Sequence, residues 1–476
     1  MIKKLFGSQL RLNMASGVVA TVISTVAMAI AYPIYLHFLD YEIYGLWLVL
    51  ATVLSFAQLG NLGIDQAIMK LVAEEHGRGD IEGIQRYVTT ALALLCLSGT
   101  VALILILALK NPIIAAFNLS DENAKVVAWL LPYIGILSIY VFIVQALNAT
   151  LSGLGRMDLA NYTQSIGRIV AVGVAATLLY SGRGIESLLI GNALSYLCVH
   201  IMSLSCIRRT AHIRFLQIGN LDAQRGKRLL CFGGGVFGGS LISMLFSPFN
   251  KLMLSRYAGV STIPIYEIAY TGSMQVRGLI EAGLRALMPE VSRLNGITTQ
   301  EARDRIIQIY RRAMRLIFVT GIPIYGVLFI LSPLLLRFWL GDRFVETLPN
   351  AFRIMLISSF VSLFGALVYY VIMGFGRIRY LIVTNCIGAG TSCLLVTAYY
   401  VITRSVSVNS IGFCGIAANA AALIYLVRRA TDLLASDTNQ FVSGEHSLPY
   451  EITVVENTPV TSVSLKHVQG DSIDGE

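Results

Sequence analysis

Residues 87–109 read YVTTALALLCLSGTVALILILAL and contain no charged side chain between Arg86 and Lys110. An α-helix needs about 20 consecutive apolar residues to cross the hydrocarbon core of a bilayer, which is about 30 Å thick. The strands of a transmembrane β-barrel instead alternate apolar and polar residues over about ten positions, so an unbroken apolar block of this length excludes them. The stretch therefore predicts a membrane-spanning α-helix.

The same pattern recurs along the whole chain. Of its 476 residues, 55% are hydrophobic and only 13% are charged. Soluble proteins carry about 25% charged residues, so this chain has too few to cover a water-soluble globule. We predict an all-α polytopic membrane protein with about twelve transmembrane helices. The predicted spans are 13–37, 44–66, 87–109, 126–150, 163–182, 188–207, 229–249, 264–288, 313–338, 349–374, 381–403 and 411–427.

Lysine and arginine collect in alternate segments between the predicted spans. With the N-terminus inside, the inner segments hold 23 of these residues and the outer segments hold eight, leaving out the C-terminal tail. Cytoplasmic loops are enriched in lysine and arginine, so both termini are predicted to be cytoplasmic. This distribution also accounts for the net charge of +9. The positive charge therefore does not indicate a nucleic-acid partner, and we expect no such partner.

The cysteines and histidines give no indication of a metal site. The seven cysteines lie in or beside apolar runs, and the chain contains no CxxC, HxxxH or HExxH spacing. We therefore expect neither a bound metal nor a cofactor.

The two halves of the chain match each other at a nearly constant offset. Residues 153–156 (GLGR) correspond to 374–377 (GFGR) at an offset of 221, and 43–45 correspond to 265–267 at 222. Two further short matches have offsets of 219 and 221. Halves with six spans each have the same orientation in the membrane, and transporters built in this way bind substrate between the two repeats.

The repeat predicts the organisation of the chain. We expect an N-terminal six-helix lobe at 1–207, a basic cytoplasmic linker at 208–228 and a C-terminal six-helix lobe at 229–432. The acidic segment 433–476 has no sustained helical period and is predicted to be a disordered cytoplasmic tail.

One predicted span has an unusual glycine content. Gly233, Gly234 and Gly235 are followed by Gly238 and Gly239. Each glycine lowers helix stability by about 1 kcal/mol relative to alanine, so the cluster needs a reason. Close packing against another helix and bending of the span both remain open.

Several motifs resemble those of a known transporter family. Tyr44-Gly45-Leu46-Trp47 precedes Leu59-Gly60-Asn61-Leu62-Gly63-Ile64-Asp65, and Leu151-Ser152-Gly153-Leu154-Gly155-Arg156 precedes a new span. In the second half, Tyr266-Glu267-Ile268-Ala269-Tyr270 leads to Met288-Pro289-Glu290-Val291-Ser292-Arg293. Over about residues 10–430, the chain resembles the polysaccharide-transport proteins, the O-antigen flippase branch of the multidrug/oligosaccharidyl-lipid/polysaccharide exporter superfamily.

This resemblance implies a fold, an activity and partners. The fold would be two six-helix lobes around a central cavity. The activity would be flipping of an undecaprenyl-pyrophosphate-linked oligosaccharide to the outer leaflet of the bacterial inner membrane by alternating access. Anionic membrane lipids and other polysaccharide-assembly proteins would be further partners.

Charged residues inside the spans are candidate site residues, since a charge at the bilayer centre costs roughly 2.5–3.5 kcal/mol. Arg277, Glu281 and Arg285 are spaced by four and share one helix face, and Tyr270 extends this stripe outward. The stripe has one positive charge in excess, and a pyrophosphate could supply the missing anion through bidentate arginine contacts. The alternative is an arginine–glutamate–arginine ladder that only stabilises the helix.

Two further charged residues complete the candidates. Arg168 lies about five residues into its span, where it could bind substrate or extend to the cytoplasmic headgroups. The repeat offset places Asp65 opposite Arg285, which predicts that the two pair as an inner gate when the cavity opens outward. The alternative is that Asp65 caps the segment 67–86, because aspartate is a favoured N-cap residue.

Two other functions compete with a flippase. A Na⁺- or H⁺-coupled multidrug antiporter of the same superfamily would need acidic residues in one cavity, whereas the central charge here is positive. A membrane-embedded polysaccharide polymerase or ligase would need a large outer loop, and no predicted outer segment exceeds about 16 residues. The sequence therefore favours transport of an anionic substrate and predicts that the chain is not an enzyme.

Overall fold

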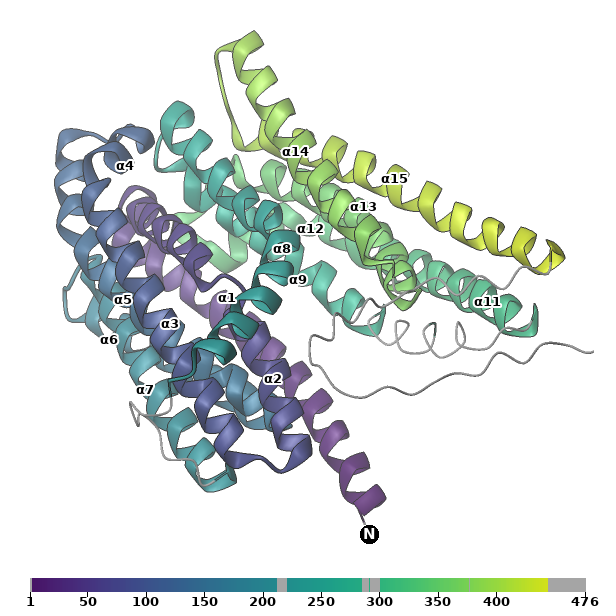
Figure 1. The fold of residues 1–476 in the computed structure, drawn as a ribbon. Helices are drawn as coiled ribbons and strands as arrows, with labels where there is room; N and C mark the ends of the chain where they lie inside the picture. Colours follow the sequence, from purple (N-terminus) through teal and green to yellow (C-terminus); the bar gives the residue numbers. More distant parts are fainter. Residues whose placement is uncertain (1, 212–220, 285–290, 292–299, 376, 444–476) are drawn as a thin grey trace, which may run out of the picture. The chain divides into compact units, whose positions relative to one another are not determined.

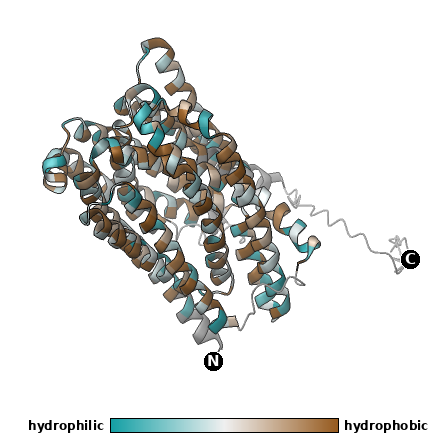
Figure 2. Cartoon of the chain, turned by 90° about the vertical axis from the view of Figure 1, so that its left-hand side faces the viewer, coloured by the Kyte–Doolittle hydropathy of each residue, from teal (hydrophilic) through white to brown (hydrophobic). Residues whose placement is uncertain are grey.

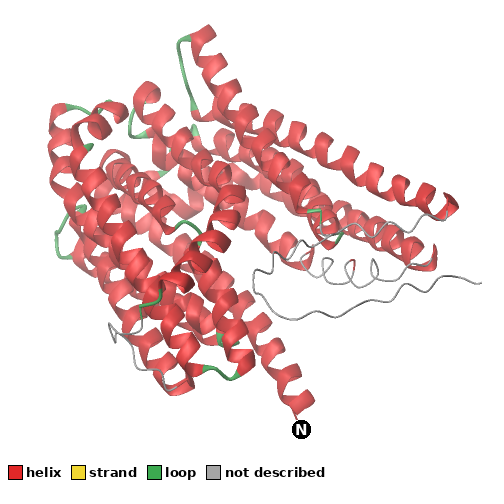
Figure 3. Cartoon of the chain, in the orientation of Figure 1, coloured by secondary structure: helices red, strands yellow, loops and turns green. Residues whose placement is uncertain are grey.

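The computed structural model describes residues 2–211, 221–284, 291, 300–375 and 377–443. Contacts between residues divide the chain into two units, Met1–Ala430 and Thr431–Glu476, and the first unit is described below. All the regular secondary structure of the described residues is helical, as Figure 3 shows.

The first half of the chain forms seven α-helices (Figure 1). They are α1 (Ile2–Ala57), α2 (Ile64–Arg78), α3 (Ile81–Ala108), α4 (Lys110–Phe117), α5 (Asp121–Gly153), α6 (Met157–Tyr180) and α7 (Glu186–Ala211).

The described part of the second half adds seven more α-helices. They are α8 (Ala223–Ala258), α9 (Thr262–Leu284), α11 (Gln300–Leu316), α12 (Ile322–Leu340), α13 (Leu348–Gly374), α14 (Ile378–Thr403) and α15 (Val408–Ser443). A π-helical turn, η3 (Ile317–Gly321), joins α11 to α12, and two 3-10 turns, η1 (Gln58–Asn61) and η4 (Gly341–Arg343), follow α1 and α12.

Nine helical segments of the described residues are long and apolar enough to cross a membrane. The first, Ala15–Asn61, covers two predicted spans, which are separated by a kink at Asp40 (φ 58°, ψ −177°). Helices α8 and α9 coincide with two more predicted spans but are not among these nine segments. The chain is therefore an all-helical polytopic membrane protein, and the number of twelve spans stays a prediction.

Large apolar side chains cover the outside of the long helices. Phe338 is 90% exposed, Ile402 is 81% exposed and Leu394 is 71% exposed. Figure 2 shows hydrophobic residues running along the length of the helices. Such exposure is unfavourable in water, whereas lipid tails are as apolar as these side chains. The surface is therefore suited to contact with lipid.

The motif Leu59–Asp65 forms the turn between α1 and α2. Helix α1 ends at Ala57, and after η1 both Leu62 (φ 51°) and Gly63 (φ 70°) adopt left-handed conformations. A right-handed helix cannot pass through two such residues. The predicted span 44–66 is therefore too long at its inner end, and Asp65 lies instead in the first turn of α2.

Close packing explains the first glycine of the cluster in α8. A Cβ atom added to Gly233 would lie 2.8 Å from the carbonyl oxygen of Leu62, and one added to Gly63 would overlap the backbone of Gly233. The neighbouring Gly234 has no atom within 4 Å of an added Cβ. Of the two interpretations of the cluster, close packing is therefore confirmed at Gly233.

Helix α8 contacts both halves of the chain. At its start, the Arg225 guanidinium donates to the carbonyl oxygen of Gly83 (2.6 Å) on α3. At its other end, the Asn250 amide donates to the Tyr266 hydroxyl (3.1 Å) on α9.

Helix α8 begins with a side-chain cap, because Asp222 accepts the backbone N–H groups of Gln224 and Arg225. Hydrogen bonds from the backbone N–H groups of Arg225 and, to a smaller extent, Gln224 lower the pKa of the Asp222 carboxyl group.

The internal repeat reappears in the helix boundaries. Helix α5 ends at Gly153 and α13 ends at Gly374, while α6 begins at Met157 and α14 begins at Ile378. Each pair has the offset of 221 found in the sequence. The exact lobe limits stay a prediction.

The tail prediction needs one correction. Helix α15 continues to Ser443, so the first part of the segment 433–476 is helical and not disordered. The remainder of that segment lies outside the described residues.

The contact of Gly233 can be tested against its neighbour. Gly233→Ala should lower the apparent melting temperature of the detergent-solubilised protein by a few degrees, because overpacking costs about 1–3 kcal/mol. Gly234→Ala is the matched control, and it should leave the melting temperature unchanged or raise it through better helix propensity. Tryptophan fluorescence measures the melting temperature. Equal melting temperatures for the two variants would rule out the close contact.

Candidate functional site

The structure contains a cavity in each half of the chain. One, of about 460 Å³, is lined by residues of α8, α9, α13, α14 and α15. The other, of about 430 Å³, is lined by residues of η1, α2, α5, α6 and α7. The charged lining residues are Arg277 and Glu281 in the first cavity, and Arg168 and Asp65 in the second. All four are predicted site residues.

An ion pair on α9 faces the C-terminal cavity. The Nε atom of Arg277 lies 3.2 Å from Oε2 of Glu281, and the two side chains are 25% and 18% exposed. This geometry is not that of a hydrogen bond, and Nε has no hydrogen-bond partner among the described residues. Glu281 also accepts the hydroxyl of Tyr370 (2.8 Å). Glu281 is therefore better satisfied than Arg277.

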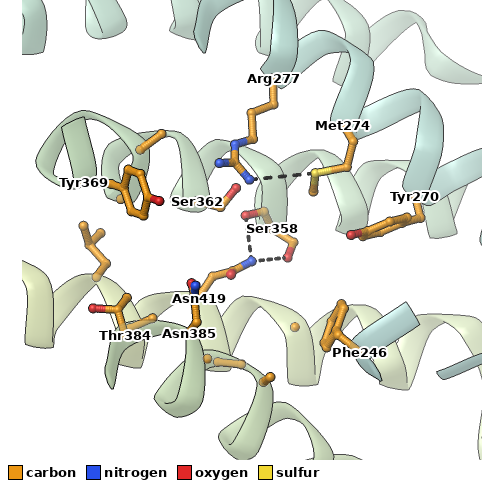
Figure 4. Close-up of a pocket in the computed structure, with 18 of the residues that line it drawn as sticks. Phe246, Tyr270, Met274, Arg277, Ser358, Ser362, Tyr369, Thr384, Asn385 and Asn419 are labelled. Carbon is orange, nitrogen blue, oxygen red and sulfur yellow. Dashed lines mark hydrogen bonds between the residues drawn. The ribbon is translucent and has the colours of Figure 1, made fainter. Parts of the chain in front are cut away.

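The far end of the Arg277 side chain contacts a methionine. Its Nη1 atom lies 4.0 Å from the sulfur of Met274, as Figure 4 shows. Arg285 lies outside the described residues, so the second step of the predicted ladder is untested. The structure brings Arg277 and Glu281 together, which agrees with both sequence interpretations of the stripe.

Tyr270 extends the stripe as an aromatic wall of the same cavity. Its ring stacks on that of Tyr266, with centroids 5.5 Å apart and planes inclined by 9°, and it lies 6.4 Å from the ring of Phe246. In the same cavity, the Asn419 amide donates to the hydroxyl of Ser358 (3.0 Å), as Figure 4 shows. The cavity thus combines stacked aromatic rings, hydroxyl groups and one arginine.

A second ion pair lies beside this cavity but does not line it. Lys251 Nζ on α8 is 2.9 Å from Glu267 Oε2 on α9, and the two side chains are 11% and 18% exposed. Lys251 and Glu267 neutralise each other at close range. Removing either partner would leave an uncompensated charge, so this pair belongs to the packing of α8 on α9.

Arg168 in the N-terminal cavity has no such partner. Its side chain is exposed, and no carboxylate of the described residues lies within ion-pair distance of it. The structure describes two of the predicted site arginines, Arg277 and Arg168. Of these two, Arg168 is the more available to an anionic ligand.

Asp65 lines the same cavity and contacts the start of α2. Its carboxylate accepts the backbone N–H of Gln66 (2.8 Å). The N-cap residue of α2 is Gly63, so the prediction that Asp65 caps the helix is wrong in its literal form. The carboxylate still lies in the first helical turn, where negative charge is favourable. The gate with Arg285 stays a prediction, because Arg285 is outside the described residues.

Sequence reasoning missed the neutral amides of the N-terminal cavity. The cavity contains Gln58, Gln66, Gln145, Asn148, Gln164 and Asn192. Several of these lie inside otherwise apolar predicted spans, and an amide in a span is costly unless it has a partner or faces a water-filled space. That signal is available from the sequence, although it is weaker than the signal from a charge.

The fold is that of known membrane transporters. The chain is similar to a multidrug resistance MATE family transporter of the MOP superfamily in an inward-facing conformation, with a TM-score of 0.71 and 13% identity over 90% of this chain and 96% of that chain. It is also similar to a MOP superfamily transporter from Pyrococcus furiosus, with a TM-score of 0.60 and 14% identity over 90% and 96% of the two chains. At such low identity these likenesses establish the fold.

The sequence places the chain within a narrower group. The sequence model of the polysaccharide biosynthesis protein family matches residues 10–295, and the chain belongs to this family. A Shigella flexneri protein named "Putative O-antigen transporter" is 18% identical over 346 residues, which is 72% of this chain and 80% of that protein. The chain is therefore a multi-pass membrane protein of the polysaccharide biosynthesis protein family, and it has the fold of MOP superfamily transporters.

One substitution separates the two interpretations of the α9 stripe. If Glu281 competes with an anionic ligand for Arg277, Glu281→Gln should strengthen binding of inorganic pyrophosphate by up to about fivefold. This factor corresponds to the free energy of a partly exposed ion pair, which is at most about 1 kcal/mol. Phosphorus NMR of the purified protein in lipid nanodiscs measures this affinity. Glu346→Gln removes an exposed carboxylate outside both cavities and should have no effect. Lower stability of Glu281→Gln with unchanged affinity would instead identify a structural ladder.

Proposed function

We propose that this transporter moves an undecaprenyl-pyrophosphate-linked oligosaccharide from the inner to the outer leaflet of the bacterial cytoplasmic membrane. The product would serve assembly of O-antigen or another surface polysaccharide. The observation that carries the proposal is Arg277, a cation that lines a cavity near the middle of α9 with an incompletely bonded guanidinium. The family and the Shigella relative support the same substrate class.

The pyrophosphate would interact with arginine side chains. Arg277 and Arg168 each line one cavity, and Arg168 has no carboxylate partner among the described residues. A guanidinium binds phosphate oxygens through two parallel hydrogen bonds, and water exclusion in a cavity strengthens this contact. Among the described residues, each cavity also contains one carboxylate, but Glu281 accepts the Tyr370 hydroxyl and Asp65 accepts the N–H of Gln66. The unused hydrogen-bonding capacity therefore lies on the two arginines, which suits an anion better than the cationic drugs of a multidrug antiporter.

Translocation would proceed by alternating access of two six-helix lobes. Contacts near the predicted outer ends support such a movement, because Arg343 donates to the carbonyl oxygen of His37 (2.7 Å) and Tyr41 donates to that of Arg343 (2.9 Å). These hydrogen bonds join α1 to η4 and would break when the outer side opens. Both chain termini would face the cytoplasm, where inner loops rich in lysine and arginine contact anionic lipids.

Substitution of Arg277 tests the proposal. Arg277→Ala should reduce surface polysaccharide to about a tenth or less in a deletion strain, because a hydrogen bond to a charged group contributes about 1.5–3 kcal/mol. Arg277→Lys should restore only part of it, since lysine lacks the bidentate geometry. Immunoblotting of membranes checks that each variant accumulates.

Arg183→Ala provides the matched control. Arg183 is exposed between α6 and α7 and lines neither cavity, so its removal should leave the polysaccharide unchanged. Wild-type polysaccharide in the Arg277→Ala strain would exclude Arg277 from the substrate site.

A further inference from the structure

The N-terminal cavity has a lining that pyrophosphate binding does not require. Six side-chain amides converge there from η1, α2, α5, α6 and α7, which pack together in the first half of the chain. They are Gln58, Gln66, Gln145, Asn148, Gln164 and Asn192. No comparable set of amides lines the cavity of the second half among the described residues.

Most of these amides have hydrogen-bonding capacity to spare. The side chains of Gln58, Gln66 and Gln164 make no hydrogen bond within the described part of the chain. Gln145 accepts the Asn61 amide at Oε1 (2.8 Å), which leaves its own nitrogen as a donor.

The buried Asn148 is oriented in a similar way. It accepts the Ser203 hydroxyl at Oδ1 (3.0 Å), so its nitrogen also remains a donor. The cavity therefore presents several donors and acceptors that are held by the surrounding helices.

Neutral amides suit a particular kind of ligand. An amide both donates and accepts hydrogen bonds, and so does a sugar hydroxyl group. An apolar drug in this cavity would bury the amides without partners, which is unfavourable. An inorganic anion alone would need cations, of which the cavity has one, Arg168.

We propose that the N-terminal cavity binds the carbohydrate part of the substrate through hydrogen bonds between its amides and sugar hydroxyl groups. This inference rests on the proposed function and adds that the sugars and the pyrophosphate of the substrate bind to different parts of the protein. The sugars contact the amides of η1, α2 and α5–α7, while the pyrophosphate contacts the arginines, foremost Arg277 on α9.

The cavity of the second half is the rival location. Its amides are partly used internally, because Asn419 donates to Ser358 (3.0 Å) and Asn250 donates to Tyr266 (3.1 Å). Asn385 lines this cavity without a hydrogen bond in the described part of the chain (Figure 4). It is therefore the residue whose replacement tests the rival.

The test uses the full chain in lipid nanodiscs with two soluble probes. One is the oligosaccharide released from the surface polysaccharide of the bacterium that carries the gene, followed by saturation-transfer difference NMR. The other is inorganic pyrophosphate, followed by phosphorus NMR. In the double variant Gln58→Met/Gln164→Met, the oligosaccharide affinity should fall about tenfold, because methionine keeps the length of glutamine and removes its amide. The pyrophosphate affinity should stay within twofold, which also shows that the variant is folded.

Two further variants complete the experiment. Gln224→Met changes an exposed glutamine at the start of α8, outside both cavities, and should alter neither affinity. Asn385→Leu should also leave oligosaccharide binding unchanged.

The possible results separate the sugar site from the proposed function. Unchanged oligosaccharide binding in the double variant, absent binding in the wild type, or a loss in Asn385→Leu alone would each overturn the sugar site. The wild-type protein could instead bind the oligosaccharide but not pyrophosphate. That result would contradict the pyrophosphate contact of the proposed function and would leave the sugar site in place.

Discussion

The absence of water in the bilayer core is the constraint on which this structure depends. Every backbone N–H and C=O group in that region must be bonded within the protein, so the spans are helices. Departures from the helix occur where the chain can tolerate them, as at Leu62 and Gly63, which turn the chain from α1 into α2. The same turn allows the backbone of Gly63 to meet that of Gly233 on α8.

The same constraint sorts the charged residues into two kinds. Lys251 and Glu267 are largely buried and lie at 2.9 Å, so they neutralise each other within the helix packing. Arg277 and Arg168 line cavities instead, and neither guanidinium is fully bonded among the described residues. A transporter needs the second kind of charge, because a site whose hydrogen-bonding groups are all used within the protein cannot bind a ligand.

Much of the fold could be predicted because membrane spans have strong sequence signals. The apolar block 87–109 lies almost entirely within α3, and the stripe on α9 does bring Arg277 next to Glu281. The α1–α2 turn was harder to predict, because Leu62 is apolar and its left-handed conformation depends on tertiary packing. The amides of the N-terminal cavity were missed since a neutral side chain in a span gives a weaker signal than a charge.

Deletion of the gene, followed by analysis of membrane lipids, tests the central claim most directly. The measurement is the amount of undecaprenyl-pyrophosphate-linked oligosaccharide and the leaflet in which an impermeant sugar-modifying reagent reaches it. The account predicts that complete repeat units accumulate in the inner leaflet, protected from the reagent in intact cells, while surface polysaccharide is lost. Unchanged surface polysaccharide together with altered drug tolerance would contradict it and would favour a multidrug antiporter.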